Sequence, residues 1–308
     1  MAQLEADLLI LGAGPAGLSA AQYGSRANLK VLAIEQLSPG GQALSIDKLE
    51  NYPGDPTPRS GFDFAEDMHR QAENFGAKIL SDAVLSLKNE KNSFTAVLGS
   101  GGEIKARAVI LATGATHRTL GIPGEAEFNG RGVSYCASCD GPFFKGKRIL
   151  VVGGGDAACD EARFLAFLSD RVLLVHRRDK FRAQKSLAER VLHDPRIEVR
   201  LNTSPVKILG DKQVNAVILE NTADHTQYEE PVNAVFIFVG TTPQTSLVPD
   251  AEKDEAGYIV TDQRMASSIP GIFVAGDVRA SPFRQVVVAA AEGAIAAHCA
   301  AEYIENFC

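Results

Sequence analysis

The sequence predicts an α/β protein made of two parallel-sheet domains, one inserted into the other. Two buried strands each run into a glycine-rich turn that opens a helix, and these turns begin at Gly12 and Gly153. A third apolar strand, 271–277, ends in a glycine and an acid without repeating the glycine pattern. We therefore expect this last strand to complete one of the two earlier domains.

Size and composition fit a two-domain protein without a membrane segment. The chain has 308 residues, enough for about two domains of roughly 150 residues each. Its formal charge of −7 argues against nucleic acid or anionic lipid as the main partner. The N-terminus shows no secretory pattern, and no apolar stretch reaches the roughly 20 residues that span a bilayer. Five cysteines without an export signal favour the cytoplasm, where a close cysteine pair is catalytic or metal-binding. We expect a cytoplasmic protein that binds neither nucleic acid nor membrane.

The first glycine turn lies between two predicted buried strands, 7–11 and 30–35, and opens a helix over 16–28. It reads Gly12-Ala13-Gly14-Pro15-Ala16-Gly17, a G-x-G-x-x-G pattern. Such glycines permit the tight turn, let the backbone approach a pyrophosphate and let the helix pack closely on the strand. Glu35 ends the second strand, where its carboxylate can accept hydrogen bonds from ribose hydroxyls. A dinucleotide site is predicted, the alternative being a glycine turn without a ligand.

The second glycine turn differs from the first in the charge that follows it. It reads Gly153-Gly154-Gly155-Asp156-Ala157-Ala158, between predicted strands 147–152 and 171–175. Glu35 and His176 each lie 23 residues after the first glycine of their turn, and His176 is followed by Arg177, Arg178 and Arg182. Arginines pair with a 2′-phosphate, which a carboxylate would repel. The first site therefore suits FAD or NAD and the second NADP. The alternative is a solvated basic strand end.

In each glycine-turn unit, a few short alternating β-strands joined by turns, which we call a β excursion, precede a last buried strand. The excursions cover 78–109 and 198–239, and an alanine-rich helix is predicted over 285–306. We expect two Rossmann-like, three-layer ββα domains. The first comprises residues 1–115 and 244–308, and the second comprises residues 116–243.

The second domain also contains Cys136-Ala137-Ser138-Cys139-Asp140-Gly141. Two thiols separated by two residues can close a small disulfide and so store two electrons. The arrangement lowers the pKa of one thiol from its free value of roughly 8.5. The same spacing is half of a zinc site, although the sequence has no second cysteine pair or Cys/His cluster to complete one.

In combination these motifs resemble the low-molecular-weight, bacterial-type thioredoxin reductases, class II pyridine nucleotide-disulfide oxidoreductases, over nearly the whole chain. The resemblance implies FAD-binding residues in the fingerprint, two flavin loops, the crossover and the closing motif: Gly12, Gly14, Pro15, Ala16, Gly17, Glu35, Gln36, Gly41, Gln42, Asn51, Thr113, Gly114, Gly276, Asp277, Arg284, Gln285 and Val286. It implies NADPH-binding residues in the second unit: Gly153, Gly155, Asp156, Ala157, Ala158, His176, Arg177, Arg178 and Arg182.

The resemblance also implies an activity and roles for the cysteine pair. NADPH would pass a hydride to the flavin, and electrons would reach the Cys136–Cys139 disulfide and then thioredoxin. Cys139 would be the thiol next to the flavin, Cys136 the thiol that attacks thioredoxin, and Asp140 the acid/base. The alternative for Asp140 is a turn residue before Gly141. A homodimer is implied in the same way, and Ala291 stands where the family often has glycine.

Thioredoxin docking is expected at Arg131, Phe143 and Phe144, which flank the cysteine pair. The alternative is that one or both phenylalanines pack inward. Cys159, Cys299 and Cys308 are expected to be non-catalytic, and no metal site is expected. Two rival functions stay open: a reductase for another dithiol protein, and a flavin-binding protein whose cysteine pair holds zinc.

Overall fold

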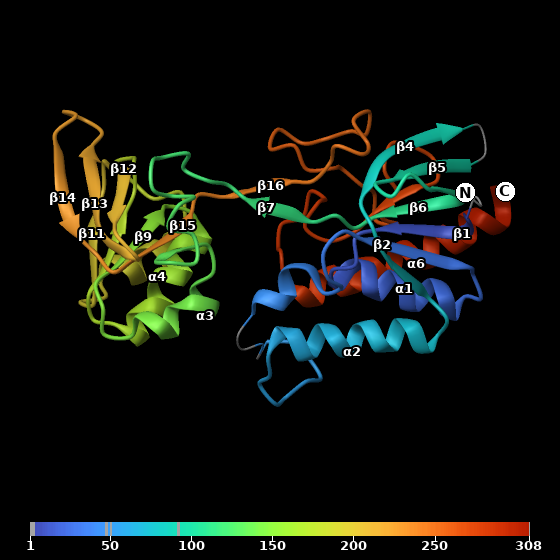
Figure 1. Ribbon diagram of the computed structural model, residues 1–308, viewed down its shortest axis with the longest axis horizontal. Helices are drawn as coiled ribbons and strands as arrows, with labels where there is room; N and C mark the ends of the chain where they lie inside the picture. The colour runs from blue at the N-terminus through green and yellow to red at the C-terminus, as the bar shows by residue number, and fades with distance from the viewer. Residues whose placement is uncertain (1–3, 47–48, 50, 91–92, 308) are drawn as a thin grey trace. The chain divides into compact units, whose positions relative to one another are not determined.

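The chain forms two compact units, which Figure 1 shows as a ribbon. The computed structural model describes residues 4–46, 49, 51–90 and 93–307, with the backbone alone for Ser45, Ser138, Cys139 and Phe307. Unit 1 comprises residues 1–116 and 242–308, and unit 2 comprises residues 117–241. The chain passes between them along β7 (Ala115–His117) and β16 (Thr241–Pro243), which pair with each other. Unit 2 therefore begins one residue after, and ends two residues before, the predicted bounds of 116 and 243.

Unit 1 is built on a seven-stranded sheet in the order β3-β2-β1-β6-β5-β4, with β17 paired to the end of β6. Strands β1, β2, β3, β6 and β17 run parallel, while β4 and β5 form an antiparallel excursion. The strands are β1 (Leu4–Leu11), β2 (Val31–Glu35), β3 (Lys78–Ser81), β4 (Val84–Glu90), β5 (Ser93–Leu98), β6 (Glu103–Leu111) and β17 (Ile272–Val274).

Helices α1 (Pro15–Arg26), α2 (Gly61–Asn74) and α6 (Val286–Phe307) lie on one side of this sheet (Figure 1). Successive residues of a strand point to opposite faces, so a strand buried on both faces must be apolar throughout. Leu8 and Ile10 pack among the helices, whereas Leu9 and Leu11 pack against the opposite layer. The 3-10 turn η1 (Gly41–Ser45) follows β2.

The approach of α6 to α1 is close enough to require glycine. A Cβ on Gly293 would lie 2.1 Å from the carbonyl oxygen of Ala16, and Ser19 donates a 2.6 Å hydrogen bond to the carbonyl of Ala290. By length and composition α6 is also the one helix in the described ranges that could cross a membrane, over 286–306. Because 56% of that stretch is buried, its apolar residues belong to the core of unit 1.

Unit 2 repeats the plan with a five-stranded parallel sheet in the order β11-β10-β9-β15-β8. One face is covered by helices and the other by the antiparallel sheet β12-β13-β14. The sheet strands are β8 (Val133–Ser134), β9 (Ile149–Gly153), β10 (Val172–Val175), β11 (Ile197–Arg200) and β15 (Ala234–Phe238). The excursion strands are β12 (Thr203–Gly210), β13 (Val214–Asn221) and β14 (Gln227–Pro231).

The helical elements of unit 2 are α3 (Ala137–Asp140), η2 (Gly141–Phe144), α4 (Asp156–Leu168) and α5 (Lys185–Leu192). Helix α4 is the helix predicted to follow the second glycine turn, whereas α5 was not predicted from the sequence. The predicted α/β class with three-layer domains is confirmed. In unit 2, β9 lies between β10 and β15 and runs parallel to both, so the carboxyl ends of these three strands lie at one edge of the sheet. In open α/β sheets, ligands bind outside the carboxyl ends of the strands.

The α1–α6 contact predicts that Gly293→Ala destabilises unit 1, because the added methyl would overlap a backbone carbonyl that cannot rotate away. We expect a loss of about 1–3 kcal/mol in the free energy of unfolding, measured by urea denaturation. Gly102→Ala is the matched control in the same unit, since its Cβ would make only ordinary contacts of 3.7 Å or more. Equal stability of the two variants would contradict the prediction.

Candidate active site and nucleotide sites

The glycine turn of unit 1 forms a cradle at the carboxyl end of β1. Gly12 has φ +100°, and a Cβ there would lie 2.4 Å from the carbonyl oxygen of Ala112. At Gly14 the nearest described atom would be 3.9 Å away, so this side of the turn is open. Gly14 is the N-cap of α1, and among the described residues no side chain caps the helix. Its first N–H groups are therefore available to a phosphate.

Glu35 lies beside this turn, as predicted, and holds it in place. Its Oε2 accepts a 2.8 Å hydrogen bond from the N–H of Ala13, and its Oε1 accepts a 3.0 Å bond from the N–H of Leu37. Each carboxylate oxygen has a further lone pair. The same group can therefore orient the turn and accept a hydrogen bond from a ribose hydroxyl.

The predicted crossover residues are joined by a reciprocal pair of bonds that the sequence did not reveal. Thr113 Oγ1 donates to the carbonyl of Gln244 at 2.6 Å, and Gln244 Nε2 donates to the carbonyl of Thr113 at 2.6 Å. The carbonyl of Gly114 accepts from the N–H of Gln244, and Gln42 Nε2 donates 2.7 Å to the carbonyl of Ala115. Gln42, Thr113 and Gly114 are thus fixed close to one another.

Two more predicted FAD residues meet although 234 residues separate them. Asn51 Nδ2 donates a 3.1 Å hydrogen bond to Gln285 Oε1. Pro15 and Val286 are half-buried at the starts of α1 and α6, whereas Gln36 is exposed.

Asp277 and Arg284 complete this corner of unit 1. Burial raises the pKa of Asp277, the charge of Arg284 opposes the rise, and the charge of Glu292 adds to it. The Arg284 guanidinium lies 3.9 Å from the centre of the Tyr258 ring. Its buried Nε has no hydrogen-bond partner within the described part of the chain. An orphaned buried donor is uncommon in folded proteins and indicates that an acceptor is missing. Together with the open cradle at Gly14, it fits a bound FAD.

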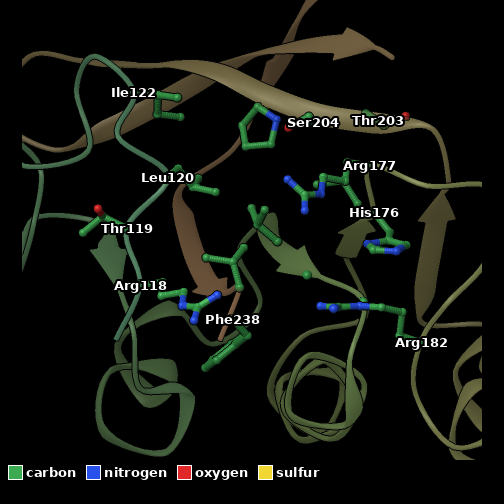
Figure 2. Close-up of a pocket in the computed structure, with 16 residues that line it drawn as sticks. Arg118, Thr119, Leu120, Ile122, His176, Arg177, Arg182, Thr203, Ser204 and Phe238 are labelled. Carbon is green, nitrogen blue, oxygen red and sulfur yellow. The ribbon is translucent and has the colours of Figure 1, made fainter. Parts of the chain in front are cut away.

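Unit 2 has a cavity of about 330 Å³ at the carboxyl ends of β9, β10 and β15, shown in Figure 2. Four residues predicted to bind NADPH line it, namely Gly153, His176, Arg177 and Arg182, together with Gly154. The side chains of Arg177 and Arg182 extend into the same space, and Arg118 reaches it from the opposite side (Figure 2).

The charges around this cavity favour an anion. Arg177, Arg178 and Arg182 are exposed, and none of them pairs with a carboxylate among the residues that the structure describes. Burial lowers the pKa of His176, and these three charges lower it further. The imidazole is therefore neutral at pH 7, and its buried Nε2 has no partner in the same described ranges. These groups fit the 2′-phosphate and ribose side of NADPH.

The rest of the second fingerprint has mixed roles. A Cβ on Gly154 would lie 2.2 Å from His176 Nδ1, so this glycine makes room for the imidazole. Gly155 has no described atom within 4 Å of the corresponding position and leaves the start of α4 open. Asp156 accepts hydrogen bonds from the backbone N–H and side-chain amide of Gln184 at 2.7 and 3.2 Å, and its contact with the nucleotide stays a prediction. Ala158 is buried against Gly153.

Sequence reasoning missed several lining residues, namely Arg118, Thr119, Leu120, Ile122, Thr203, Ser204, Pro205 and Phe238. Of these, Arg118 carries the only signal that could have been used, a cation directly after the crossing strand β7. Nothing local shows that β7 ends beside the loop after β10. The arrangement follows from the sheet order.

Cys136 is disulfide-bonded. It is the first residue of the segment 136–141, which we call the redox turn. The side chain of Cys139 falls outside the described residues. Ser134, which is buried, accepts a 3.1 Å hydrogen bond from the N–H of Cys136 and donates one to its carbonyl at 3.1 Å. The N–H of Asp140 donates 3.2 Å to the same carbonyl, closing the single turn of α3. The half-buried Asp140 thus lies one helical turn from Cys136.

A buried carboxylate supports the residue before Cys136. Tyr135 donates its hydroxyl to Glu125 at 2.8 Å, and Glu125 also accepts from the N–H groups of Leu120 and Gly121 at 2.8 and 2.7 Å. Glu125 is only 3% exposed, so all three donors are needed to stabilise its charge. Burial and this bond raise the pKa of Tyr135 well above its ordinary value.

The structure separates the two phenylalanines predicted to receive a partner. Phe143 is 78% exposed, whereas Phe144 packs edge-on against Phe236, with the ring centres 6.1 Å apart. Arg131 is exposed, with its guanidinium 5.7 Å from the centre of the Phe128 ring. Phe143 and Arg131 therefore offer a surface, while Phe144 mainly anchors η2.

The remaining cysteines do not form a second redox pair among the described residues. Cys159 and Cys299 are free and buried. Burial raises the pKa of Cys159 to about 11, with Asp156 and Asp160 adding to the rise, and burial also raises the pKa of Cys299. Cys308 lies outside the described residues. No group of three or more His, Cys, Asp or Glu side chains in the described part could hold a metal ion.

Comparisons with known proteins agree with this arrangement. The model of the pyridine nucleotide-disulphide oxidoreductase family matches residues 6–293. A thioredoxin reductase of Treponema pallidum is 55% identical over 300 residues, covering 97% of each chain. One of Listeria innocua is 46% identical over 302 residues, covering 97% of this chain and 94% of the relative. The solved thioredoxin reductase of Lactococcus lactis gives a TM-score of 0.84 at 39% identity, covering 97% of this chain and 99% of that one.

The chain therefore belongs to the pyridine nucleotide-disulphide oxidoreductase family. Within that family it is similar over nearly its whole length to thioredoxin reductases, which confirms the resemblance drawn from the sequence. Its cofactors are FAD and NADPH, as predicted.

The cavity of unit 2 generates a prediction about nucleotide preference. Replacing Arg177 and Arg182 by alanine should raise the Kd for NADPH by about tenfold or more and change that for NADH little, because charge-assisted hydrogen bonds to the 2′-phosphate are lost. Titration calorimetry with both nucleotides measures the effect. Arg190→Ala, an exposed arginine on α5, is the control. A parallel loss for both nucleotides would contradict a 2′-phosphate contact.

Proposed function

We propose that this chain is an NADPH-dependent flavoprotein disulfide reductase that reduces thioredoxin through the pair Cys136 and Cys139. One observation carries the proposal: the disulfide-bonded Cys136 lies in the same unit as an arginine-lined cavity at the carboxyl ends of parallel strands. A pyridine nucleotide site and a redox disulfide on one unit are what such an enzyme requires. Unit 1 supplies the second dinucleotide fold.

The residues that would hold each cofactor follow from the geometry. FAD would lie on the glycine turn at Gly14, with Glu35 and Asp277 toward its sugar and Arg284 toward its anionic or carbonyl oxygens. NADPH would lie over Gly153 and Gly155 with its 2′-phosphate among Arg177, Arg178 and Arg182. When bound, the two groups supply hydride acceptance and hydride donation. The protein orients them and handles protons.

The thiol chemistry is assigned to the redox turn. The Cys136 thiolate attacks one sulfur of the thioredoxin disulfide, whose S–S bond breaks, and the released thioredoxin thiolate takes up a proton. The Cys139 thiolate then attacks the Cys136 sulfur of the resulting mixed disulfide, whose bond to thioredoxin breaks. The enzyme disulfide reforms, and the second thioredoxin sulfur leaves as a thiolate that takes a proton from water. Asp140 is the proposed acid that gives the proton to the departing thiolate. Ser134 holds the Cys136 backbone during both attacks.

Cys136→Ser tests this assignment. The variant should retain reduction of its flavin by NADPH, seen as loss of visible flavin absorbance, and should lose thioredoxin reduction completely, because no thiol remains to attack. Cys159→Ser, which alters a buried free thiol in the same unit, is the control and should keep both steps. If NADPH did not bleach the flavin of the Cys136 variant, the proposed order of electron transfer, from NADPH to the flavin and then to the disulfide, would be wrong. If the unmodified protein reduces a small disulfide such as DTNB but reduces none of the thioredoxins tested, its physiological substrate is another dithiol protein.

Partner docking is proposed at Arg131 and Phe143, with Phe144 supporting them from beneath. Phe143→Ala should raise the KM for thioredoxin about tenfold, the scale of a lost aromatic anchor, and leave the KM for DTNB unchanged. Phe62→Ala is the control, since Phe62 is also exposed and lies on α2 of unit 1. An equal effect on both substrates would show that Phe143 stabilises the turn rather than binding the partner.

A cytoplasmic homodimer is proposed with this function. Tyr23 and Phe75 are exposed on neighbouring helices of unit 1, and the guanidinium of Arg26 lies over both rings at 5.9 and 5.0 Å. An apolar surface bordered by charge is typical of subunit contacts.

A further inference from the structure

A buried ion pair of unit 1 has no assigned role in the chemistry described above. Glu292 is the only acidic residue within 289–301 of α6, and its side chain is 6% exposed. Its Oε2 accepts a 2.8 Å hydrogen bond from the N–H of Gly276, and its Oε1 accepts from Arg279 Nη1. Arg279 Nε in turn donates 3.0 Å to Thr261 Oγ1. Removing such a pair from water is costly, so its retention calls for a function.

The pair lies where three parts of the proposed FAD site meet. A Cβ on Gly276 would come within 2.9 Å of the Ala16 Cβ, so the turn before Asp277 touches the start of α1. Gly293, next to Glu292, touches the carbonyl of Ala16. The stretch 289–293 of α6 therefore contacts the glycine-turn helix and the Gly276–Asp277 turn together. Glu292 is the member of that stretch that is hydrogen-bonded to the turn.

We propose that Glu292 and Arg279 are positioning residues for FAD, which fix the Gly276–Asp277 turn against the first turn of α1. The inference rests on the proposed FAD site of unit 1 and adds residues that do not themselves touch the cofactor. Gly276 has φ +78°, a conformation that glycine adopts readily but that steric contacts of its own do not fix. The bond from its N–H to a fixed carboxylate restricts this freedom and sets the direction of Asp277.

The chemistry of the contact requires a carboxylate rather than an amide. Glu292 faces two donors, the Gly276 N–H and the Arg279 guanidinium, so both of its oxygens must accept. Glutamine has the same shape but would present an NH₂ group to one of these donors. If Arg279 is also replaced by an apolar residue, one donor disappears. The amide oxygen of glutamine can then serve Gly276 alone.

The Kd for FAD, measured by fluorescence titration of the flavin-free protein, tests the proposal through a cycle of variants. Glu292→Gln should raise the Kd about tenfold, because a buried donor is left facing a donor. The double variant Glu292→Gln with Arg279→Met should bind FAD more tightly than Glu292→Gln alone, recovering most of the loss. Glu302→Gln is the control on the same helix, since its exposed pair with Arg264 is distant from the turn.

A purely structural pair would behave differently. If the pair were purely structural, Glu292→Gln would lower the thermal midpoints of the flavin-free and the flavin-bound protein by the same amount. If the pair positions FAD, Glu292→Gln also weakens binding, so the difference between the two midpoints becomes smaller than in the wild type. A wild-type Kd in Glu292→Gln, or an unchanged difference between the midpoints, would overturn the inference. If Glu292→Gln does not fold, Arg279→Met alone is compared with the double variant, and equal Kd values overturn it.

Asp277→Asn separates this inference from the function on which it rests. If FAD binds that variant as tightly as the wild type, the proposed FAD site is wrong. If Asp277→Asn weakens binding and the Glu292 variants do not, the site stands and the role of Glu292 and Arg279 is refuted.

Discussion

The structure depends on the absence of side chains where a strand end meets a helix start. A Cβ on Gly17 would lie 1.9 Å from the carbonyl of Gly12, and one on Gly153 would lie 2.4 Å from the carbonyl of Phe238. Only glycine at position 17 lets α1 approach the end of β1 so closely, and only glycine at position 153 lets β9 approach the end of β15 so closely. This approach brings the uncapped N–H groups of α1 and α4 to the carboxyl edges of their sheets, where an anion can reach them. The sheets, the covering helices and the cavity of unit 2 are arranged around these two contacts.

The same backbone plan gives two different sites because the residue at the end of the second strand differs. In unit 1 it is Glu35, whose carboxylate is held by the N–H groups of Ala13 and Leu37. In unit 2 it is His176, kept neutral by burial and by the arginines beside it. A carboxylate accepts from ribose hydroxyls and repels a further phosphate, whereas unpaired guanidinium groups attract one. Electrostatics therefore distinguishes the ligands of units that share one architecture.

The redox turn is held by hydrogen bonds from residues that precede it. Ser134 bonds both backbone groups of Cys136, and Tyr135 is tied to the buried Glu125. Thiol exchange demands that an attacking sulfur be directed along the disulfide, so a firmly held backbone serves the chemistry. On the other side of the turn, Phe144 packs inward and leaves Phe143 exposed. One side of the turn is thus anchored and the other presents a surface.

The sequence by itself determined the two nucleotide folds, their order and the position of the cysteine pair. Glycine requirements and apolar runs act over a few residues, so the bounds of the β1–α1 and β9–α4 units could be predicted to within three residues. Only the tertiary structure decided which distant groups meet. It brought Arg118 to the cavity, turned Asp156 toward Gln184, joined Asn51 to Gln285 and paired Glu292 with Arg279. These contacts arise from strand order and helix packing, which place residues far apart in the chain at the same edge of a sheet. No local pattern records that placement.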